Sequence, residues 1–332
     1  MVREMKAAGL SVAPGRVVRH SIDLVELPDG TRVSLPVVLV NGAGDGPRLY
    51  LGAGIHGDEA NGVHIVSRVL SRLKPEQLSG GLVCVPVQNP LAFQFDHRIP
   101  LGLYLKSPLD QAPIDPWSCF PGNAEGNITE MLTRKLFELI TSCEYAIDIH
   151  TPTRGGRYVP ITILPHPSLG APFKRSEELA VAFGSGYIMR TDKGMYVRDG
   201  VLSVEATRAG VPSLMFEVGE GGRLEEEVTA IGARCVLNLL RFLKMIPGEV
   251  QKPAETVLMK EFVGLRARRG GFLTTAPSLG ARVKRGDILA SISTIQGEEV
   301  ETVVAPADGV FVRSTTFPTV ASGERVATLG LE

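Results

Sequence analysis

The most constraining feature of this sequence is the alternation between short apolar runs and amphipathic stripes over residues 48–245. The apolar runs are continuous, as is typical of parallel strands that are buried on both faces. The stripes have helical spacing, and the clearest one begins with Asn127 and Glu130 placed as a capping box. Strands that alternate with helices predict an α/β domain with a mixed, largely parallel sheet flanked by helices. We expect strands at 48–55, 82–87, 144–149 and 214–218, and helices at 127–143 and 223–245.

The two ends of the chain follow a different pattern. The first 45 residues alternate short β-branched runs with turn signals such as Asn41-Gly42. After Pro253, short apolar runs are separated by glycine-containing turns and no helical period remains. We therefore expect an N-terminal β segment at 1–45 joined to an α/β domain at 46–250, followed by a small all-β, barrel-like domain at 255–332.

Charge and composition argue against several classes of function. The 332 residues include 35 Lys and Arg against 36 Asp and Glu, a net charge of −1, so no basic surplus attracts nucleic acid or an anionic membrane. Residues 1–10 contain no apolar signal-peptide core, and no stretch reaches the roughly 18 apolar residues of a membrane span. The four cysteines lack a Cys-x-x-Cys spacing, which favours free thiols. These features predict a cytoplasmic protein that acts on a small molecule.

Two histidines stand directly after apolar strand runs. His56 ends the run that begins at Leu49, and His150 ends another. Because ligands bind at the carboxyl ends of strands in an open parallel sheet, we expect the two side chains to converge. Glu59 follows His56 at i+3, and the three residues form a two-histidine, one-carboxylate set typical of catalytic zinc, with one position left for water. The alternative for each histidine is a hydrogen-bonded structural residue, the commoner outcome for a single strand-end histidine.

Glu217 also follows an apolar strand run and is the natural proton acceptor for such a metal site. Hydrolysis needs one because an activated water must lose a proton and a leaving amine must gain one. The alternative, a carboxylate at a helix N-terminus, suits Glu220 and 225–227 better. Asp148 lies two residues before His150 on the same strand, so both side chains point the same way. Asp148 either orients a ligand or is a buried structural residue.

A series of short motifs runs through the chain in order. They are Gly54-Ile55-His56-Gly57-Asp58-Glu59, Asn89-Pro90 with Ala92-Phe93, Arg98, Phe120-Pro121-Gly122, Thr129-Glu130, Asp148-Ile149-His150 and Glu217-Val218-Gly219. Over about residues 35–330 the sequence resembles the succinylglutamate desuccinylase/aspartoacylase family, whose catalytic domain is similar to zinc carboxypeptidases. The resemblance implies one Zn²⁺ bound by His56, Glu59 and His150, with Glu217 as the general acid/base. Arg98 matches the arginine that polarises the scissile carbonyl and stabilises the oxyanion.

One stretch departs from the family pattern. Members that cleave acidic N-acyl amino acids carry an Asn-Arg pair before Phe-Pro-Gly, where this chain has Trp117-Ser118. A serine cannot replace a bidentate guanidinium fork, which argues against acetylaspartate and succinylglutamate as substrates. The tryptophan predicts a bulkier or more apolar pocket wall. Arg154 and Arg157 are candidates for carboxylate recognition, with solvated loop arginines as the alternative.

The C-terminal β domain resembles the flattened barrel of biotinyl and lipoyl carriers at 283–289 and 305–310. A carrier needs a lysine on the hairpin between these motifs, and residues 286–332 contain none, so carrier function is excluded. The resemblance to the hydrolase family implies instead that the domain borders the active-site cleft, where it affects substrate access or contacts in a homo-oligomer.

Three functions are compatible with these sequence features. The first is a zinc-dependent deacylase that cleaves the amide bond of a small N-acylated amino acid or related amide, with ester cleavage left open. The second is a metallocarboxypeptidase that acts on short peptides. The third is a non-catalytic small-molecule binder.

Overall fold

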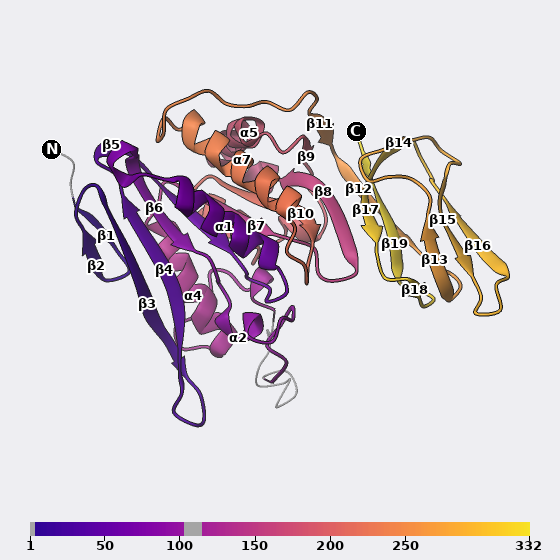
Figure 1. The fold of residues 1–332 in the computed structure, drawn as a ribbon, viewed down its shortest axis with the longest axis horizontal. Coiled ribbons are helices and arrows are strands. Elements are labelled where there is room, and N and C mark those ends of the chain that lie inside the picture. Colours follow the sequence, from indigo (N-terminus) through magenta and orange to yellow (C-terminus); the bar gives the residue numbers. More distant parts are fainter. Residues whose placement is uncertain (1–3, 103–114) are drawn as a thin grey trace.

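The structure, a computed structural model, describes residues 4–102 and 115–332. Its central feature is one long mixed sheet with helices packed on both faces of its middle part (Figure 1). Four parallel strands form that middle part, in the order β10 (Ser213–Glu220), β7 (Tyr145–His150), β5 (Gly44–Ala53) and β6 (Ser79–Val85). Each overlaps a strand predicted from the sequence, and the predicted largely parallel sheet is confirmed.

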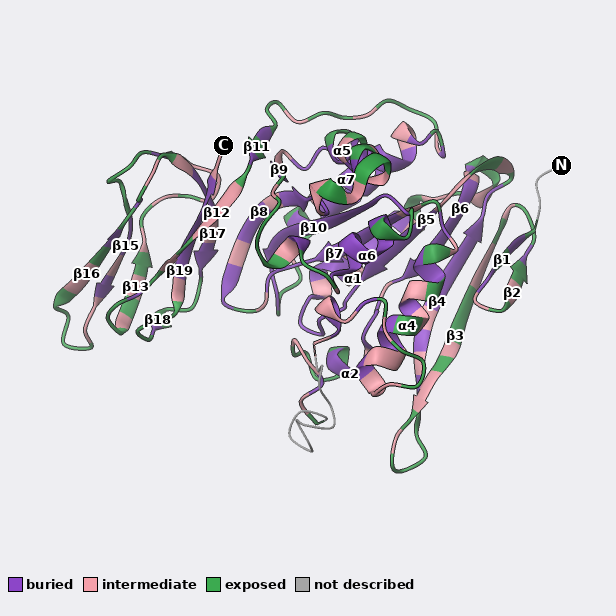
Figure 2. Ribbon diagram, turned by 180° about the vertical axis from the view of Figure 1, so that it is seen from behind, coloured by how far each residue is buried: buried purple, intermediate pink, exposed green. Residues whose placement is uncertain are grey.

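Helices bury both faces of this sheet, and in Figure 2 its middle strands are coloured mostly as buried. The first face carries α1 (Ala60–Arg72), α5 (Gly170–Phe183) and α7 (Glu226–Phe242), and the second carries α4 (Ile128–Thr141) and α6 (Leu202–Arg208). A one-turn helix, α2 (Pro90–Phe93), lies near the carboxyl edge of β5. The capping box predicted at Asn127 and Glu130 is present at the start of α4. No helix in the described ranges is long and apolar enough to span a membrane.

Antiparallel strands extend the sheet on both sides. Beyond β6 lie β4 (Arg32–Asn41) and β3 (Arg16–Glu26), and the hairpin of β1 (Met5–Ala7) and β2 (Leu10–Val12) packs against the core on the α4 side. Beyond β10 lies β8 (Gly156–Ile163), which is followed by β9 (Tyr187–Met189) and β11 (Val257–Met259). The N-terminal residues are therefore integral to the sheet that carries the site.

Strand β8 was missing from the sequence prediction because Pro160 interrupts its apolar run. A proline inside a sheet is tolerated at an edge or a bulge. Here the pairing register between β8 and β10 shifts after Glu217, so that Val159 and Pro160 lie opposite Val218 alone. The bulge absorbs the proline, and it lies directly beside a predicted catalytic residue.

The C-terminal domain continues the long sheet. Strand β17 (Gly309–Thr315) pairs antiparallel with β8, and β19 (Arg325–Leu331) and β12 (Glu261–Arg266) follow it. A second sheet contains β16 (Glu299–Val304), β15 (Ile288–Ser293), β13 (Gly271–Thr275) and β18 (Thr319–Val320), while β14 (Arg282–Val283) pairs with β17. The two sheets share a hydrophobic core of their own. The pairing of β17 with β8 brings this domain to the carboxyl edge of the parallel strands.

Candidate active site

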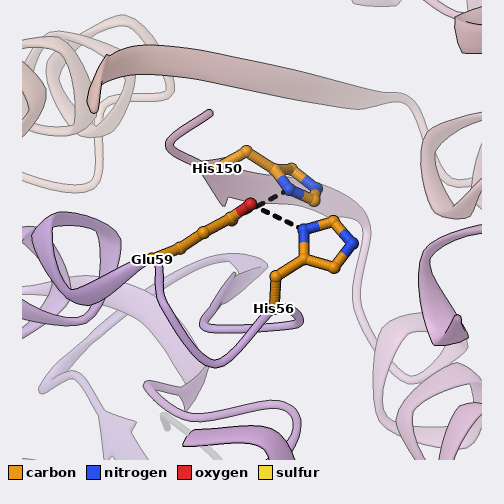
Figure 3. A group of neighbouring side chains, drawn as sticks. All are labelled: His56, Glu59 and His150. Carbon is orange, nitrogen blue, oxygen red and sulfur yellow. Dashed lines mark hydrogen bonds and ion pairs between the residues drawn. The ribbon is translucent and has the colours of Figure 1, made fainter. Parts of the chain in front are cut away.

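Three buried side chains meet at the carboxyl edge of the parallel strands (Figure 3). His56 lies in the loop after β5, Glu59 directly precedes α1, and His150 is the last residue of the neighbouring strand β7. Glu59 Oε1 lies 2.6 Å from His56 Nδ1, and Glu59 Oε2 lies 3.1 Å from His150 Nδ1. One ligand atom from each residue lies within 4.8 Å of the other two. The structure thus brings together the three residues that the sequence predicts as metal ligands.

Two glycines allow the loop that carries His56 and Glu59 to fold. Gly54 has a φ of +62°, a conformation that side-chain-bearing residues rarely adopt. Gly57 packs so closely against helix α2 that a Cβ there would overlap the carbonyl oxygen of Ala92. The backbone itself therefore fixes the positions of the imidazole and the carboxylate.

Each imidazole also contacts an aspartate through its other ring nitrogen, Nε2. Asp148 Oδ2 lies 2.8 Å from His150 Nε2, and Asp115 Oδ1 lies 3.2 Å from His56 Nε2. Asp148 Oδ1 in turn accepts a hydrogen bond of 2.8 Å from the Gln88 amide. Both imidazoles therefore present Nδ1 to Glu59 and Nε2 to an aspartate. This arrangement is typical of metal-ligating histidines, whose outer nitrogen is bonded to a carboxylate that fixes the ring.

The electrostatics of the cluster suit a bound cation. Burial alone would raise the pKa of Glu59, but the adjacent His56 and His150 outweigh it and lower that pKa to about 2. Two imidazole nitrogens and an ionised carboxylate are the donors of many catalytic zinc sites. The residues present therefore fit the divalent metal that the sequence implies.

Glu217 lines the same pocket from β10, where it lies opposite His150 in the parallel pairing. Its Oε2 is buried and has no hydrogen-bond partner among the described residues. Burial raises the pKa of this carboxyl to about 7. A carboxyl with such a pKa can take up and release a proton near neutral pH, as a general acid/base requires.

Arg98 reaches the pocket from the loop after α2. Its Nε and Nη2 both lie 3.0 Å from Asp115 Oδ2, and its Nη1 donates to Thr153 Oγ1 at 3.0 Å. Asp115 thus bridges the predicted oxyanion arginine to His56. The sequence offers Asp115 only as the cap of the short helix at Pro116–Ser118, where its Oδ1 accepts from Trp117 N–H at 3.1 Å, and this local role gives no sign of the contacts with Arg98 and His56.

The pocket around these residues is a small cavity of about 130 Å³. Trp117 forms part of its wall and packs edge-on against Tyr196, with ring centroids 5.8 Å apart. A neighbouring cavity of about 350 Å³ shares Tyr158, Met195, Tyr196 and Arg325 with it. The bulky wall predicted from the tryptophan is thus present in the pocket of the metal cluster, as an aromatic wall of Trp117 and Tyr196.

The arginines at the pocket differ from those expected. Arg154 forms an ion pair with Asp96, and Arg157 lies 2.7 Å from Glu225, so both already have carboxylate partners. Among the described residues that line the pocket, the further arginines are Arg313 and Arg325 of the C-terminal domain. Sequence reasoning missed both, because their approach depends on the pairing of β17 with β8. The one available signal was a charged residue inside the apolar run of β17.

Comparisons with known proteins agree with this architecture. Residues 45–243 match the succinylglutamate desuccinylase/aspartoacylase catalytic domain. A curated protein of Halomonas elongata, N-alpha-acetyl-L-2,4-diaminobutyric acid deacetylase, is 26% identical over 306 residues, which is 90% of this chain and 85% of the relative.

Solved structures share the fold over almost the whole chain. The product-bound ectoine utilization protein EutE of Ruegeria pomeroyi superposes with a TM-score of 0.83 at 22% identity, covering 97% of this chain and 98% of that one. A succinylglutamate desuccinylase/aspartoacylase of Rhodobacter sphaeroides gives a TM-score of 0.81 at 24% identity, covering 99% of both chains.

Proposed function

This chain belongs to the succinylglutamate desuccinylase/aspartoacylase family, and we propose that it is a zinc-dependent deacylase of a small N-acylated amino acid or related amide. The observation that carries the proposal is the buried carboxyl of Glu217, without a hydrogen-bond partner among the described residues, in the pocket of the His56, Glu59 and His150 cluster. Burying an unpaired carboxyl costs free energy, so its presence there favours a catalytic over a structural role.

His56, Glu59 and His150 would hold the zinc ion. When bound, zinc supplies a Lewis acid that polarises the amide carbonyl and lowers the pKa of a water molecule. Asp115 and Asp148 contact Nε2 of the two imidazoles and so fix the rings with Nδ1 towards Glu59, where both Nδ1 atoms would be available to the ion.

Glu217 and Arg98 carry the remaining chemistry. The Glu217 carboxylate accepts a proton from the attacking water and passes it to the leaving nitrogen, which departs as an amine. The Arg98 guanidinium, held by Asp115 and Thr153, donates hydrogen bonds to the carbonyl oxygen as negative charge develops on it. Loss of one such donor costs on the order of 3 kcal/mol of transition-state stabilisation.

Pocket size and the relative's name together indicate the substrate class. The Halomonas elongata relative is named as a deacetylase of N-acetyl-2,4-diaminobutyric acid, a small N-acylated amino acid. A cavity of about 130 Å³ at the metal cluster suits such a compound, and the relative's name as a deacetylase favours it over the carboxypeptidase alternative. The Glu217 carboxyl, which has no hydrogen-bond partner among the described residues, argues against the non-catalytic small-molecule binder. All four cysteines are free, consistent with the proposed cytoplasmic location.

A mass-spectrometric screen tests this proposal. Zinc-loaded wild type and Glu217→Gln are each mixed with N-acyl amino acids, N-acylated diamines and short peptides. We expect wild type alone to release an acyl group from at least one small amide. Consumption by both proteins would refute the role of Glu217, and release of C-terminal residues from the peptides would favour the carboxypeptidase instead. A zinc-loaded wild type that is inert towards the whole panel would refute the deacylase proposal.

A further inference from the structure

Two arginines of the C-terminal domain line the pocket that contains the metal cluster. Arg313 comes from β17 and Arg325 from the adjacent strand β19. Both side chains are half-buried, and both belong to the same pocket as His150 and Glu217. Two cationic side chains, which we call the arginine wall, thus line the same pocket as the proposed catalytic residues.

These two guanidinium groups lack a carboxylate partner among the residues that the structure describes. The Arg313 side chain donates one long hydrogen bond, of 3.3 Å, to Thr315 Oγ1. Burial, and to a lesser extent the charge of Arg325, lowers the pKa of Arg313. Arg154 and Arg157, by contrast, are each paired with an acidic side chain. Half-buried arginines without a counter-charge are costly, which indicates that an anionic ligand completes the pair.

The absence of a side chain at Gly156 leaves room for the guanidinium group of Arg313. Gly156 of β8 lies beside Arg313, and a Cβ on Gly156 would overlap the Nη2 atom of the guanidinium. The backbone of Gly156 is therefore packed against the charged end of Arg313. A larger residue at 156 would push that group away from its place in the pocket wall.

Glu217, in the same pocket, acts on Arg313 only through its charge and forms no hydrogen bond or ion pair with either arginine among the described residues, and the other two carboxylates nearby are already matched. Asp115 is paired with Arg98 and His56, and Glu59 is paired with both imidazoles. The positive charge of the Arg313 and Arg325 wall is left for a ligand. Arginine forks bind carboxylates with two parallel hydrogen bonds, which makes a carboxylate the best-fitting partner.

We propose that Arg313 and Arg325 form a carboxylate-binding subsite for the substrate, in place of the Asn-Arg pair that Trp117-Ser118 replaces. This inference rests on the proposed deacylase function. The carboxylate belongs either to the amino acid that leaves or to a dicarboxylic acyl group. Substrate selection is then carried by the C-terminal domain, while bond cleavage is carried by the α/β domain.

Binding to an inactive protein tests the subsite directly. Zinc-loaded Glu217→Gln is titrated by calorimetry with three probes. N-acetyl-2,4-diaminobutyrate carries a carboxylate on the amine side, N-succinyl-1,3-diaminopropane carries one on the acyl side, and N-acetyl-1,3-diaminopropane carries none. Adding Arg313→Gln or Arg325→Gln is expected to weaken binding of one carboxylated probe by about 10- to 100-fold. The affinity for N-acetyl-1,3-diaminopropane, which has no carboxylate, should stay unchanged. The probe that loses affinity identifies the source of the carboxylate.

Two further variants keep the test informative. Arg266→Gln removes one positive charge from the same domain at an exposed position, so it should affect no probe. Gly156→Ala leaves Arg313 in the sequence but displaces its guanidinium, so it should weaken the same probe as Arg313→Gln, by a smaller factor. Should Arg313→Gln fail to fold, Arg313→Lys and Gly156→Ala report on the same contact.

The outcomes separate this inference from the proposed function. If the arginine variants keep the ratio of affinities for carboxylated and uncarboxylated probes, the subsite is refuted, while hydrolysis by wild type still supports the deacylase. If the carboxylated probe binds through the arginines but wild type cleaves no amide, the subsite stands and the proposed function fails. If no probe binds any of the proteins, both fail.

Discussion

Replacing Glu217 with glutamine is expected to abolish hydrolysis and, at the same time, to stabilise the metal-free protein at alkaline pH. The first effect follows from the loss of the proton acceptor, which typically costs about 10²- to 10⁴-fold in rate. The second follows from the buried Oε2 atom, which finds no hydrogen-bond partner in the described ranges. A residue placed for packing would behave in the opposite way, since its replacement would destabilise the fold.

The magnitude follows from the pKa of the carboxyl. Burial raises the Glu217 pKa from 4.5 to about 7 in the folded chain. Between these values the folded state binds a proton that the unfolded state has released, so the free energy of unfolding falls as pH rises through this window. Relative to low pH, the free energy of unfolding is lower by less than about 1 kcal/mol at pH 5 and by about 3 kcal/mol above pH 7.5. Glutamine does not titrate, so the variant escapes this loss.

Urea denaturation of the metal-free proteins at pH 5 and pH 8.5 measures the effect. The stability of Glu217→Gln relative to wild type should rise by about 2 kcal/mol between the two pH values. Glu220→Gln is the matched control: it lies on the same strand, but its carboxylate accepts from Thr316 Oγ1 at 2.7 Å and pairs with Arg223, so its loss should destabilise. A pH-independent difference for Glu217→Gln, or a variant that still hydrolyses its substrate, would refute the reasoning.

Four further changes test other parts of the molecule. Removing metal with a chelator should abolish hydrolysis, and added Zn²⁺ should restore it; full activity in protein whose metal content is shown to be negligible would contradict the mechanism. Asp148→Asn should weaken zinc binding by about 10- to 100-fold in competition with a chromogenic chelator, and unchanged affinity would make Asp148 a plain core residue. Trp117→Ala removes part of the aromatic wall and should raise KM for the preferred amide more than it lowers kcat, so an effect on kcat alone would argue against a role in binding. Asn127→Ala removes the cap of α4 and should lower the free energy of unfolding by about 1 kcal/mol with kcat unchanged, and no change in the urea midpoint would refute that assignment.

The parts of the site that sequence could predict are those set by local order along the chain. His56 and His150 directly follow strands, and parallel strands end at the same edge of a sheet, so their convergence follows from topology. Glu59 lies one short turn from His56, and Glu217 ends a third apolar run. These positions depend on short-range geometry, which apolar patterning reveals well.

The parts that could not be predicted depend on long-range pairing. Strand β8 was hidden by Pro160, and its bulge becomes understandable only when β10 is seen beside it. Arg313 and Arg325 reach the pocket because β17 adds to β8, across more than 150 residues of sequence. Asp115 is placed by its contacts with Arg98 and His56. None of these partners is encoded in the residues next to it.

The continuous sheet that joins β8 to β17 has a consequence for how such enzymes diversify. The residues that would hold the metal and move the proton lie before residue 220, while the arginine wall lies after residue 312. Exchange of the last part of the gene between relatives would therefore bring in a different pocket wall while leaving the hydrolytic residues intact. A lineage could acquire a new substrate through changes in one domain without passing through an inactive enzyme.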